Sequence, residues 1–77
     1  MSDTAERVKK VVAETLKIDT SMIKDESRFV EDLGAESIQS VELVAAFEEE
    51  FDIELDEQGA LGVKDVDSAV VFIEKHL

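Results

Sequence analysis

Residues 37–51 form the stretch that most constrains how this chain can fold. From Ser37 to Phe51 the sequence contains neither glycine nor proline. When successive residues are rotated by about 100°, as in an α-helix, the apolar side chains of this stretch gather on one wide stripe. The stripe consists of Val41, Val44, Phe47 and Phe51, widened by Leu43, with Ile38 and Ala45 at its border and Gln39, Glu42, Glu49 and Glu50 opposite. We therefore predict an amphipathic helix over 37–51.

Three further helices are predicted from local signals. Asp3 and Glu6 have the spacing of a capping box, and a helix is expected over residues 4–17. Gly59 and Gly62 confine another helix to about one turn, around 57–61, and Asp65 offers an N-cap for the last helix. The side chains of the first and last helices available to the core are Ala5, Val8, Val11, Val12, Thr15, Leu16, Val66, Ala69, Val70, Phe72, Ile73 and Leu77.

The connections between these helices differ in length. Residues 18–36 break the helical period and form a long loop, in which Gly34 gives a hinge before the central helix. We expect this loop to be held to the core by Ile23, Phe29, Val30 and Leu33. Ile53 and Leu55 alternate as in a strand, but a lone strand has nothing to pair with, so an extended linker is expected.

The length of 77 residues leaves room for one small hydrophobic core. We therefore predict a single domain over residues 1–77 and expect it to be monomeric. Its predicted fold is all-α: a four-helix bundle with three main helices, a short third helix and a long first loop.

The composition supplies few groups for catalysis. There is no cysteine, which excludes disulfides, cysteine-based zinc sites and a thiol nucleophile. The one histidine, His76, lies beside the C-terminus, where a structural role near the negative helix end is expected. We therefore expect a protein that is not itself an enzyme.

Charge is unevenly distributed along the chain. The formal net charge is -12, which disfavours nucleic acid and anionic membranes as partners. Residues 1–28 are balanced, so the whole excess lies in residues 29–77, whose only basic residues are Lys64 and Lys75. This pattern suggests a basic protein partner or a bound cation, or else a solvated surface that keeps a small protein soluble. No apolar run of membrane-spanning length and no signal-peptide pattern occurs, so a cytoplasmic location is expected.

Ser37 is the candidate for a site where chemistry is attached. It stands after Gly34-Ala35-Glu36 at the opening of the central helix. Free backbone N–H groups and the positive end of the helix dipole would favour a phosphodiester on its hydroxyl. The alternative from spacing alone is a simple N-cap serine.

The residues around Ser37 resemble the acyl carrier protein family. The resemblance rests on Phe29-Val30-Glu31-Asp32-Leu33-Gly34-Ala35-Glu36-Ser37-Ile38, on Val41-Glu42-Leu43-Val44 and on Phe47-Glu48-Glu49-Glu50-Phe51. It extends into Glu6-Arg7-Val8-Lys9-Lys10-Val11 and, more weakly, to Val63, Val66, Ala69, Phe72 and Ile73. The family is a four-helix bundle of similar size and acidity.

The resemblance implies a carrier function. Ser37 matches the serine that bears 4′-phosphopantetheine, added by a phosphopantetheinyl transferase, so the protein would be a phosphoprotein. Acyl groups would be carried as thioesters between acyl-transferring and ketosynthase-type enzymes of fatty acid synthesis or of a specialised lipid or polyketide pathway. The resemblance implies that basic patches of these partners dock on Glu36, Glu42, Glu48 and Glu49, and we expect Ile38 to add an apolar contact.

Several positions depart from the family pattern. The usual Asp-Ser-Leu-Asp is replaced by Glu36-Ser37-Ile38-Gln39, and Asp56 stands where proline is common. These changes leave open whether the carrier is general or dedicated to a special acyl group. Small residues at Ala45, Ala46, Ala60 and Ala69, near Val44, Val63 and Phe72, predict a pocket between the central helix and the later ones that could take the acyl chain.

A calcium-binding module, an unmodified adaptor and a peptidyl or aminoacyl carrier are the alternative classes of function. A calcium-binding loop between Asp19 and Glu31 lacks the Asp-x-[Asp/Asn]-x-[Asp/Asn]-Gly pattern, so loose divalent-ion binding but no specific metal site is expected. An unmodified acidic adaptor would differ from a carrier only in the state of Ser37. Peptidyl or aminoacyl carriers share the fold and the serine, while the strong acidity favours acyl carriage.

Overall fold

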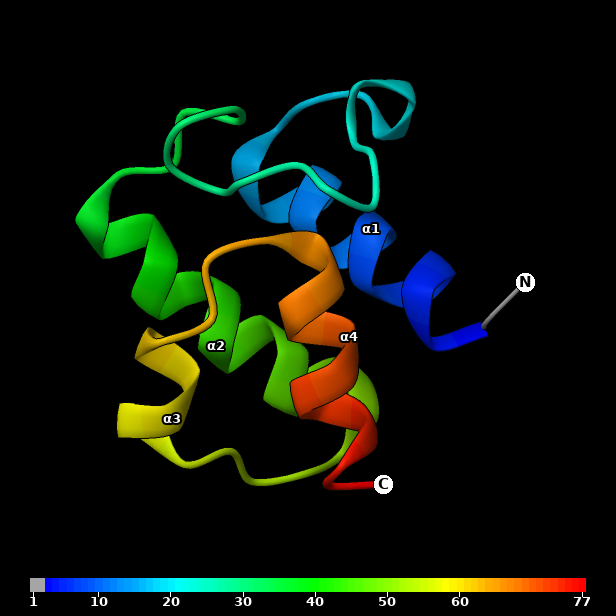
Figure 1. Cartoon of the computed structure of the whole chain (residues 1–77), viewed down its shortest axis with the longest axis vertical. Helices are drawn as coiled ribbons and strands as arrows, with labels where there is room; N and C mark the ends of the chain where they lie inside the picture. Colours follow the sequence, from blue (N-terminus) through cyan, green and yellow to red (C-terminus); the bar gives the residue numbers. More distant parts are fainter. Residues whose placement is uncertain (1–2) are drawn as a thin grey trace.

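The computed structural model describes residues 3–77, which form a helical bundle (Figure 1). Its elements, in chain order, are α1 (Asp3–Leu16), the 3-10 helix η1 (Thr20–Met22), α2 (Ser37–Phe51), α3 (Glu57–Leu61) and α4 (Val66–Glu74). Within the described residues there is no strand; the one isolated bridge pairs Arg28 with Asp65 in antiparallel fashion. The predicted all-α bundle with a short third helix is confirmed.

One hydrophobic core is shared by α1, α2, α4 and the long loop. Val8, Val12 and Val66 are fully buried, and Ile73 is 1% exposed. The core also contains Val11, Ala13, Ile23, Phe29, Ala35, Leu43, Phe47, Phe51 and Ala69. Helix α1 packs against both α2 and α4, and α3 lies against α2 (Figure 1).

The ends of α1, α2 and α3 lie within one residue of their predicted positions, and α4 begins directly after its predicted cap, Asp65. Helix α1 begins at Asp3, so Asp3 is its first helical residue and not the cap that the spacing with Glu6 suggested. Helices α1 and α2 both end in a left-handed residue, Lys17 (φ 59°) and Asp52 (φ 54°). In each case the following N–H donates to a carbonyl five residues back, which satisfies carbonyl groups of the last turn.

Three predicted core residues are exposed instead. Val41 is 56% exposed, Val30 53% and Leu77 65%. Val41 lies about 120° around α2 from the centre of the buried stripe Leu43–Phe47–Phe51, because each residue turns the helix by about 100°. Leu77 lies beyond the end of α4 at Glu74, so no helical turn directs it to the core. Val44, Val70 and Phe72 are half-buried.

The long loop is tied to the start of α4 by backbone hydrogen bonds. Phe29 N–H donates to the Lys64 carbonyl (2.9 Å), and the N–H groups of Val66 and Asp67 donate to the carbonyls of Ser27 (3.0 Å) and Asp25 (2.9 Å). These bonds make the loop an ordered wall of the bundle, with η1 and the segment before α2 on its outer side (Figure 1).

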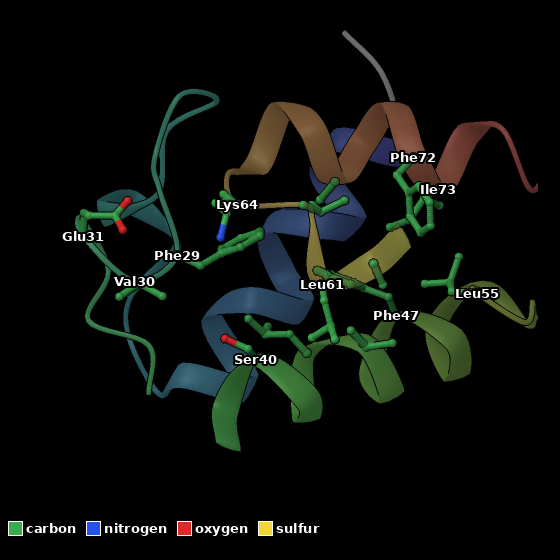
Figure 2. A pocket seen from close by; sticks show the side chains of 15 residues that line it. Phe29, Val30, Glu31, Ser40, Phe47, Leu55, Leu61, Lys64, Phe72 and Ile73 are labelled. Carbon is green, nitrogen blue, oxygen red and sulfur yellow. The ribbon is translucent and has the colours of Figure 1, made fainter. Parts of the chain in front are cut away.

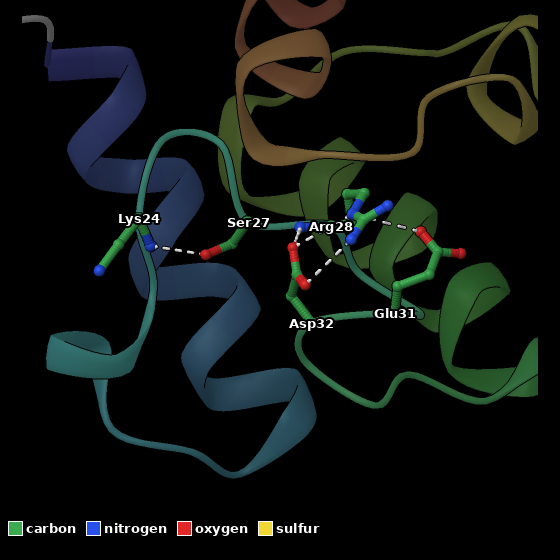
Figure 3. A network of polar contacts seen from close by, with 5 residues as sticks. All are labelled: Lys24, Ser27, Arg28, Glu31 and Asp32. Carbon is green, nitrogen blue, oxygen red and sulfur yellow. Dashed lines mark hydrogen bonds and ion pairs between the residues drawn. The ribbon is translucent and has the colours of Figure 1, made fainter.

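Polar contacts within the loop shape its second half (Figure 3). The buried Ser27 hydroxyl accepts a hydrogen bond from the Lys24 N–H at 2.8 Å. Arg28 donates from its backbone N–H (2.8 Å) and its Nε (3.3 Å) to the Asp32 carboxylate. Both bonds, the backbone one foremost, hold the pKa of Asp32 below its usual value. Glu31 also lies near Arg28, with 3.7 Å between the carboxylate and Nε.

Candidate functional site

Ser37 is the first residue of α2 and is exposed. The loop delivers it there through Gly34, whose φ of 73° is favourable for glycine, and through Ala35, which is buried and donates its N–H to the Phe29 carbonyl at 2.8 Å. With Ala35 fixed in the core, the next two residues project from the bundle. The Ser37 hydroxyl makes no hydrogen bond to any residue between 3 and 77, so it is available to a modifying enzyme.

The N-cap of α2 is Glu36, in extended backbone (φ -86°, ψ 166°), and not Ser37. Gln39 completes this end of the helix, since its Oε1 accepts a hydrogen bond from the Glu36 N–H at 2.9 Å. The interpretation of Ser37 as a simple N-cap serine is therefore wrong. The spacing Glu36-x-x-Gln39 is that of a capping box with glutamate in place of serine or threonine, a signal that the sequence contained.

The start of α2 fits a phosphodiester on Ser37. The first regular helical hydrogen bond of α2 runs from the Ser40 N–H to the Glu36 carbonyl, at 3.0 Å. The N–H groups of the turn before Ser40 therefore have no carbonyl partner within the helix. The partial positive charge of these groups favours an anion attached to the first residue. No lysine or arginine lies between Arg28 and Lys64 in the sequence, so α2 carries no basic side chain of its own, and the helix end supplies positive potential directly next to Ser37.

Ser40, one turn further along α2, is placed differently. It is half-buried, its hydroxyl lies 3.4 Å from the Glu36 carbonyl, and it lines a pocket. A group as large as a phosphodiester fits the exposed Ser37 better than Ser40. The two serines therefore provide a matched pair for testing where modification occurs.

The acidic residues predicted to face partners do not form one continuous face. Glu36, Ile38, Glu42 and Glu49 are exposed, with Ile38 at 69%. Ile38, Glu42 and Glu49 follow each other at intervals of four and seven residues, so they share the outward side of α2, opposite the buried stripe. Ile38 thus belongs to the outer surface rather than to the border of the core.

Two residues of the acidic run are used inside the protein. Glu48 is half-buried, and its carboxylate accepts a hydrogen bond from the Leu55 N–H at 2.9 Å, which fixes the linker after α2. Glu50 pairs with Arg7, with 2.9 Å between Nε and the carboxylate. Within the run Glu48-Glu49-Glu50, Glu49 is the residue left for an external partner.

A pocket opens beside α2, on the side facing α3 and α4 (Figure 2). Its volume is about 100 Å³. The predicted location is confirmed, because Val44, Ala60, Val63, Ala69 and Phe72 all contribute to the lining. Ala45 and Ala46, also expected there, are not part of it. The remaining lining residues are Phe29, Val30, Glu31, Ser40, Leu43, Phe47, Leu55, Leu61, Lys64 and Ile73.

Three polar lining residues were not predicted from the sequence: Glu31, Ser40 and Lys64. They come from the loop, from α2 and from the connection before α4, so only the fold brings them together. The signal that the sequence contains is that Lys64 is the one basic residue between positions 29 and 74.

Among residues 3–77, no three or more histidine, aspartate or glutamate side chains are grouped so as to hold a metal ion. None of the helices in this part of the chain has the length and apolar character needed to cross a bilayer.

The structure is an all-helical bundle with an exposed serine at the start of its central helix and an apolar pocket alongside. Comparison with known proteins identifies the class of small carrier domains to which this arrangement belongs. Residues 6–69 match the family described as "Phosphopantetheine attachment site". The chain therefore belongs to the phosphopantetheine-binding carrier family, and its prosthetic group is 4′-phosphopantetheine.

A solved structure from Mycobacterium tuberculosis, described as a candidate acyl carrier protein, has a similar fold. The two superpose with a TM-score of 0.86 and share 25% sequence identity. The match covers 94% of this chain and 96% of the other. This similarity supports an acyl-carrier-type protein and confirms the predicted fold over nearly the whole length.

Proposed function

We propose that Ser37 is the attachment site and that the protein carries acyl intermediates between enzymes. The observation that supports this most is the exposed, unbonded hydroxyl at the first position of α2, inside a region that matches the phosphopantetheine attachment family. When bound, 4′-phosphopantetheine supplies the terminal thiol on which acyl groups are held as thioesters. The protein would thus be a phosphoprotein that takes part in lipid metabolism as a substrate, without catalysing a reaction itself.

The chain's own residues contribute position and charge to this function. The start of α2 stabilises the negative phosphodiester. Exposed Glu42 and Glu49 offer basic partners, such as a phosphopantetheinyl transferase or a ketosynthase-type enzyme, a surface of opposite charge. Such contacts associate quickly and exchange readily, which suits a single small domain that visits several enzymes.

We further propose that the cargo belongs to fatty acid synthesis or to a related lipid or polyketide pathway. The strong acidity and the apolar pocket support acyl rather than peptidyl cargo, since the pocket presents carbon surface over most of its lining.

The test of the attachment site is an intact mass after incubation with coenzyme A and a phosphopantetheinyl transferase. Wild type should gain one phosphopantetheine group, and Ser37→Ala should gain none. Ser40→Ala is the matched control and should be modified like wild type. Modification of Ser40 would contradict the proposed attachment site. Modification of no residue in the correctly folded protein would contradict the carrier function and favour an unmodified acidic adaptor.

A further inference from the structure

The pocket beside α2 has charged as well as apolar side chains at its mouth and is apolar inside. Its exposed lining residues are Val30, Glu31, Leu61 and Lys64, and these mark the mouth. The buried ones are Phe29, Leu43, Phe47, Ala60, Ala69 and Ile73, which mark the interior. In Figure 2, Glu31, Lys64 and Ser40 lie on one side of the pocket, and Leu55, Phe72 and Ile73 lie on the other. A chain that enters this pocket therefore keeps its first atoms among polar groups.

Lys64 is the cationic group at this mouth. Its backbone is held in place because its carbonyl accepts the Phe29 N–H at 2.9 Å. Its ammonium group makes no ion pair within residues 3–77, whereas Arg7, Lys9 and Arg28 are all paired. In Figure 2 the ammonium group points toward the side of the pocket where Ser40 lies.

Glu31 does not cancel this charge. Its carboxylate lies 3.7 Å from Arg28 Nε, on the loop side of the mouth, so part of its negative charge is already balanced. The Ser40 hydroxyl donates its one proton to the Glu36 carbonyl over a long 3.4 Å and keeps its lone pairs free as acceptors. The mouth thus offers a donor, the Lys64 ammonium group, and an acceptor, the Ser40 hydroxyl oxygen.

The pocket volume limits what can be seated without rearrangement. A cavity of about 150 Å³ is large enough to hold benzene, so the roughly 100 Å³ available here corresponds to about four carbon atoms. A four-carbon acyl group is therefore the appropriate probe. Its thioester end stays at the mouth, which places the substituent on its third carbon near Lys64 and Ser40.

We propose that Lys64 and Ser40 make this carrier selective for acyl groups that bear a hydroxyl or keto oxygen on the third carbon. This inference rests on the proposed attachment at Ser37. Lys64 donates a hydrogen bond to that oxygen and, where it is a hydroxyl, Ser40 accepts one from it, while the apolar end of the chain lies against Phe47 and Phe72. An unsubstituted chain fills the same space but leaves Lys64 and Ser40 to water.

The test compares holo-protein loaded with butyryl and with 3-hydroxybutyryl groups. Loading is first verified by intact mass, which separates a failure of attachment from a failure of selectivity. The readouts are the shift in thermal midpoint relative to the unacylated holo-protein and the rate of thioester hydrolysis, each rate divided by that of the same thioester on free pantetheine. We expect 3-hydroxybutyryl to be protected about three- to tenfold more than butyryl, the effect of one hydrogen bond from a charged donor at a partly exposed site.

Variants identify the groups responsible. Lys64→Met should bring the protection ratio close to one, Ser40→Ala should lower it, and Lys64→Arg should largely retain it. Lys75→Met removes the other basic residue after position 28, which does not line the pocket, and should behave like wild type. Equal protection of both thioesters in loaded wild type, or a preference that survives Lys64→Met, would overturn this inference alone. Absence of any loading at Ser37 would overturn the proposed function and this inference with it.

Discussion

The side chain of Arg7 in α1 binds both the carboxylate and the backbone carbonyl of Glu50 in α2. Arg7 Nε lies 2.9 Å from the Glu50 carboxylate, and Nη2 donates to the Glu50 carbonyl oxygen at 2.7 Å. The guanidinium group also stacks over the Phe51 ring, 4.3 Å from its centroid. One arginine therefore fastens the last turn of α2 to α1 and covers a core aromatic residue.

Replacing Arg7 should lower stability more than replacing a neighbouring lysine. Both partners are partly exposed, which reduces the contribution of the ion pair, but the cation–π contact and the carbonyl hydrogen bond add to it. For Arg7→Ala we expect a loss of about 1 kcal/mol in the free energy of unfolding, or roughly 4–8 °C in thermal midpoint for a domain of this size. Lys10→Ala, at an exposed position of the same helix, is the control. A loss no greater than that of Lys10→Ala would show that the Arg7 contacts contribute nothing.

Asp65 should make the start of α4 sensitive to acid. Its carboxylate accepts the Ser68 N–H at 2.8 Å, and hydrogen bonding by the Ser68 side chain and backbone lowers the pKa of Asp65. A lowered pKa in the folded state means that the stabilisation is complete above the unfolded pKa of about 3.9 and is lost as pH falls through the folded value. At neutral pH, Asp65→Ala should cost about 1 kcal/mol through loss of the cap.

The pH dependence of Asp65 is best measured against Asp65→Asn, which keeps a cap but cannot titrate. Below about pH 4, wild type should lose stability relative to this variant. The comparison is needed because protonating other carboxylates also relieves their mutual repulsion in this acidic chain. Glu54→Gln, in the exposed linker, is the matched control. Parallel curves for wild type and Asp65→Asn would contradict the assigned role.

The excess negative charge should make stability depend on ions. The described bundle measures 29 × 26 × 18 Å, so at about 0.01 M salt, where the Debye length is about 30 Å, its charges repel one another across the whole molecule. Raising the salt to about 1 M shortens that length to about 3 Å and should raise the thermal midpoint. Magnesium or calcium should act at lower concentrations than sodium.

The same titration distinguishes screening from specific binding. Glu49→Gln combined with Glu54→Gln should flatten the salt dependence, because both carboxylates are exposed. A midpoint that does not change with salt would show that the acidic residues are too far apart to matter. Tight, saturable and calcium-selective stabilisation would instead support a cation-binding module.

Filling the pocket should remove the protection of an acyl chain. Ala69 is 2% exposed and lies in the pocket wall, so Ala69→Leu places extra carbon in the space beside α2. The substitution itself is expected to destabilise the holo-protein by about 1–3 kcal/mol through overpacking. The informative quantity is therefore the difference between acylated and unacylated protein within each variant. Val71→Leu, 53% exposed on the same helix, is the control. An unchanged difference in Ala69→Leu would place the acyl chain elsewhere.

The helices were predictable from sequence where the signals are local. The bounds of α2 and α3 and the Asp65 cap follow from glycine positions, capping residues and a 3.6-residue period. The exposure of Val41 was not predictable in the same way, because a wide stripe does not show which edge the neighbouring helices cover. Leu77 was wrongly expected in the core because the apolar helical pattern of α4 continues in the sequence past Glu74, where the helix ends.

Contacts between residues far apart in sequence could not be predicted. Arg7 and Glu50 are 43 residues apart, and nothing in either neighbourhood indicates the other. The bridge between Arg28 and Asp65, which holds the long loop against the bundle, also joins residues far apart in sequence and could not be predicted. For the candidate site, Ser37 could be singled out from its local motif, whereas the polar mouth of the pocket required the fold.

The last prediction concerns the outward side of α2. If basic partners dock there, Glu42→Lys should slow modification and acyl transfer mainly through the association rate, and the loss should shrink at high salt. Ile38 is 69% exposed, so Ile38→Ala should weaken docking with little salt dependence, because its contribution is apolar area. Transfer rates of both variants at two salt concentrations separate the two contributions. If the folded Glu42→Lys variant has the same transfer rates as wild type, the acidic residues on the outward side of α2 serve solubility and not partner docking.

Variants of Gln39 test why this chain lacks the acidic residue that the family usually has after the serine motif, and whether its absence reflects specialisation for one kind of acyl group. The side chain caps α2 through the Glu36 N–H, so the shorter Gln39→Asp adds a charge but shortens the reach to that bond. Gln39→Glu keeps the length and adds the same charge, and a glutamate at this position is a regular member of the capping box. Improved use of Gln39→Glu by general fatty-acid enzymes, at unchanged stability, is therefore the result expected of a dedicated carrier. If neither Gln39→Glu nor Gln39→Asp changes transfer, glutamine is present for the cap alone, and the idea of a dedicated carrier loses this support.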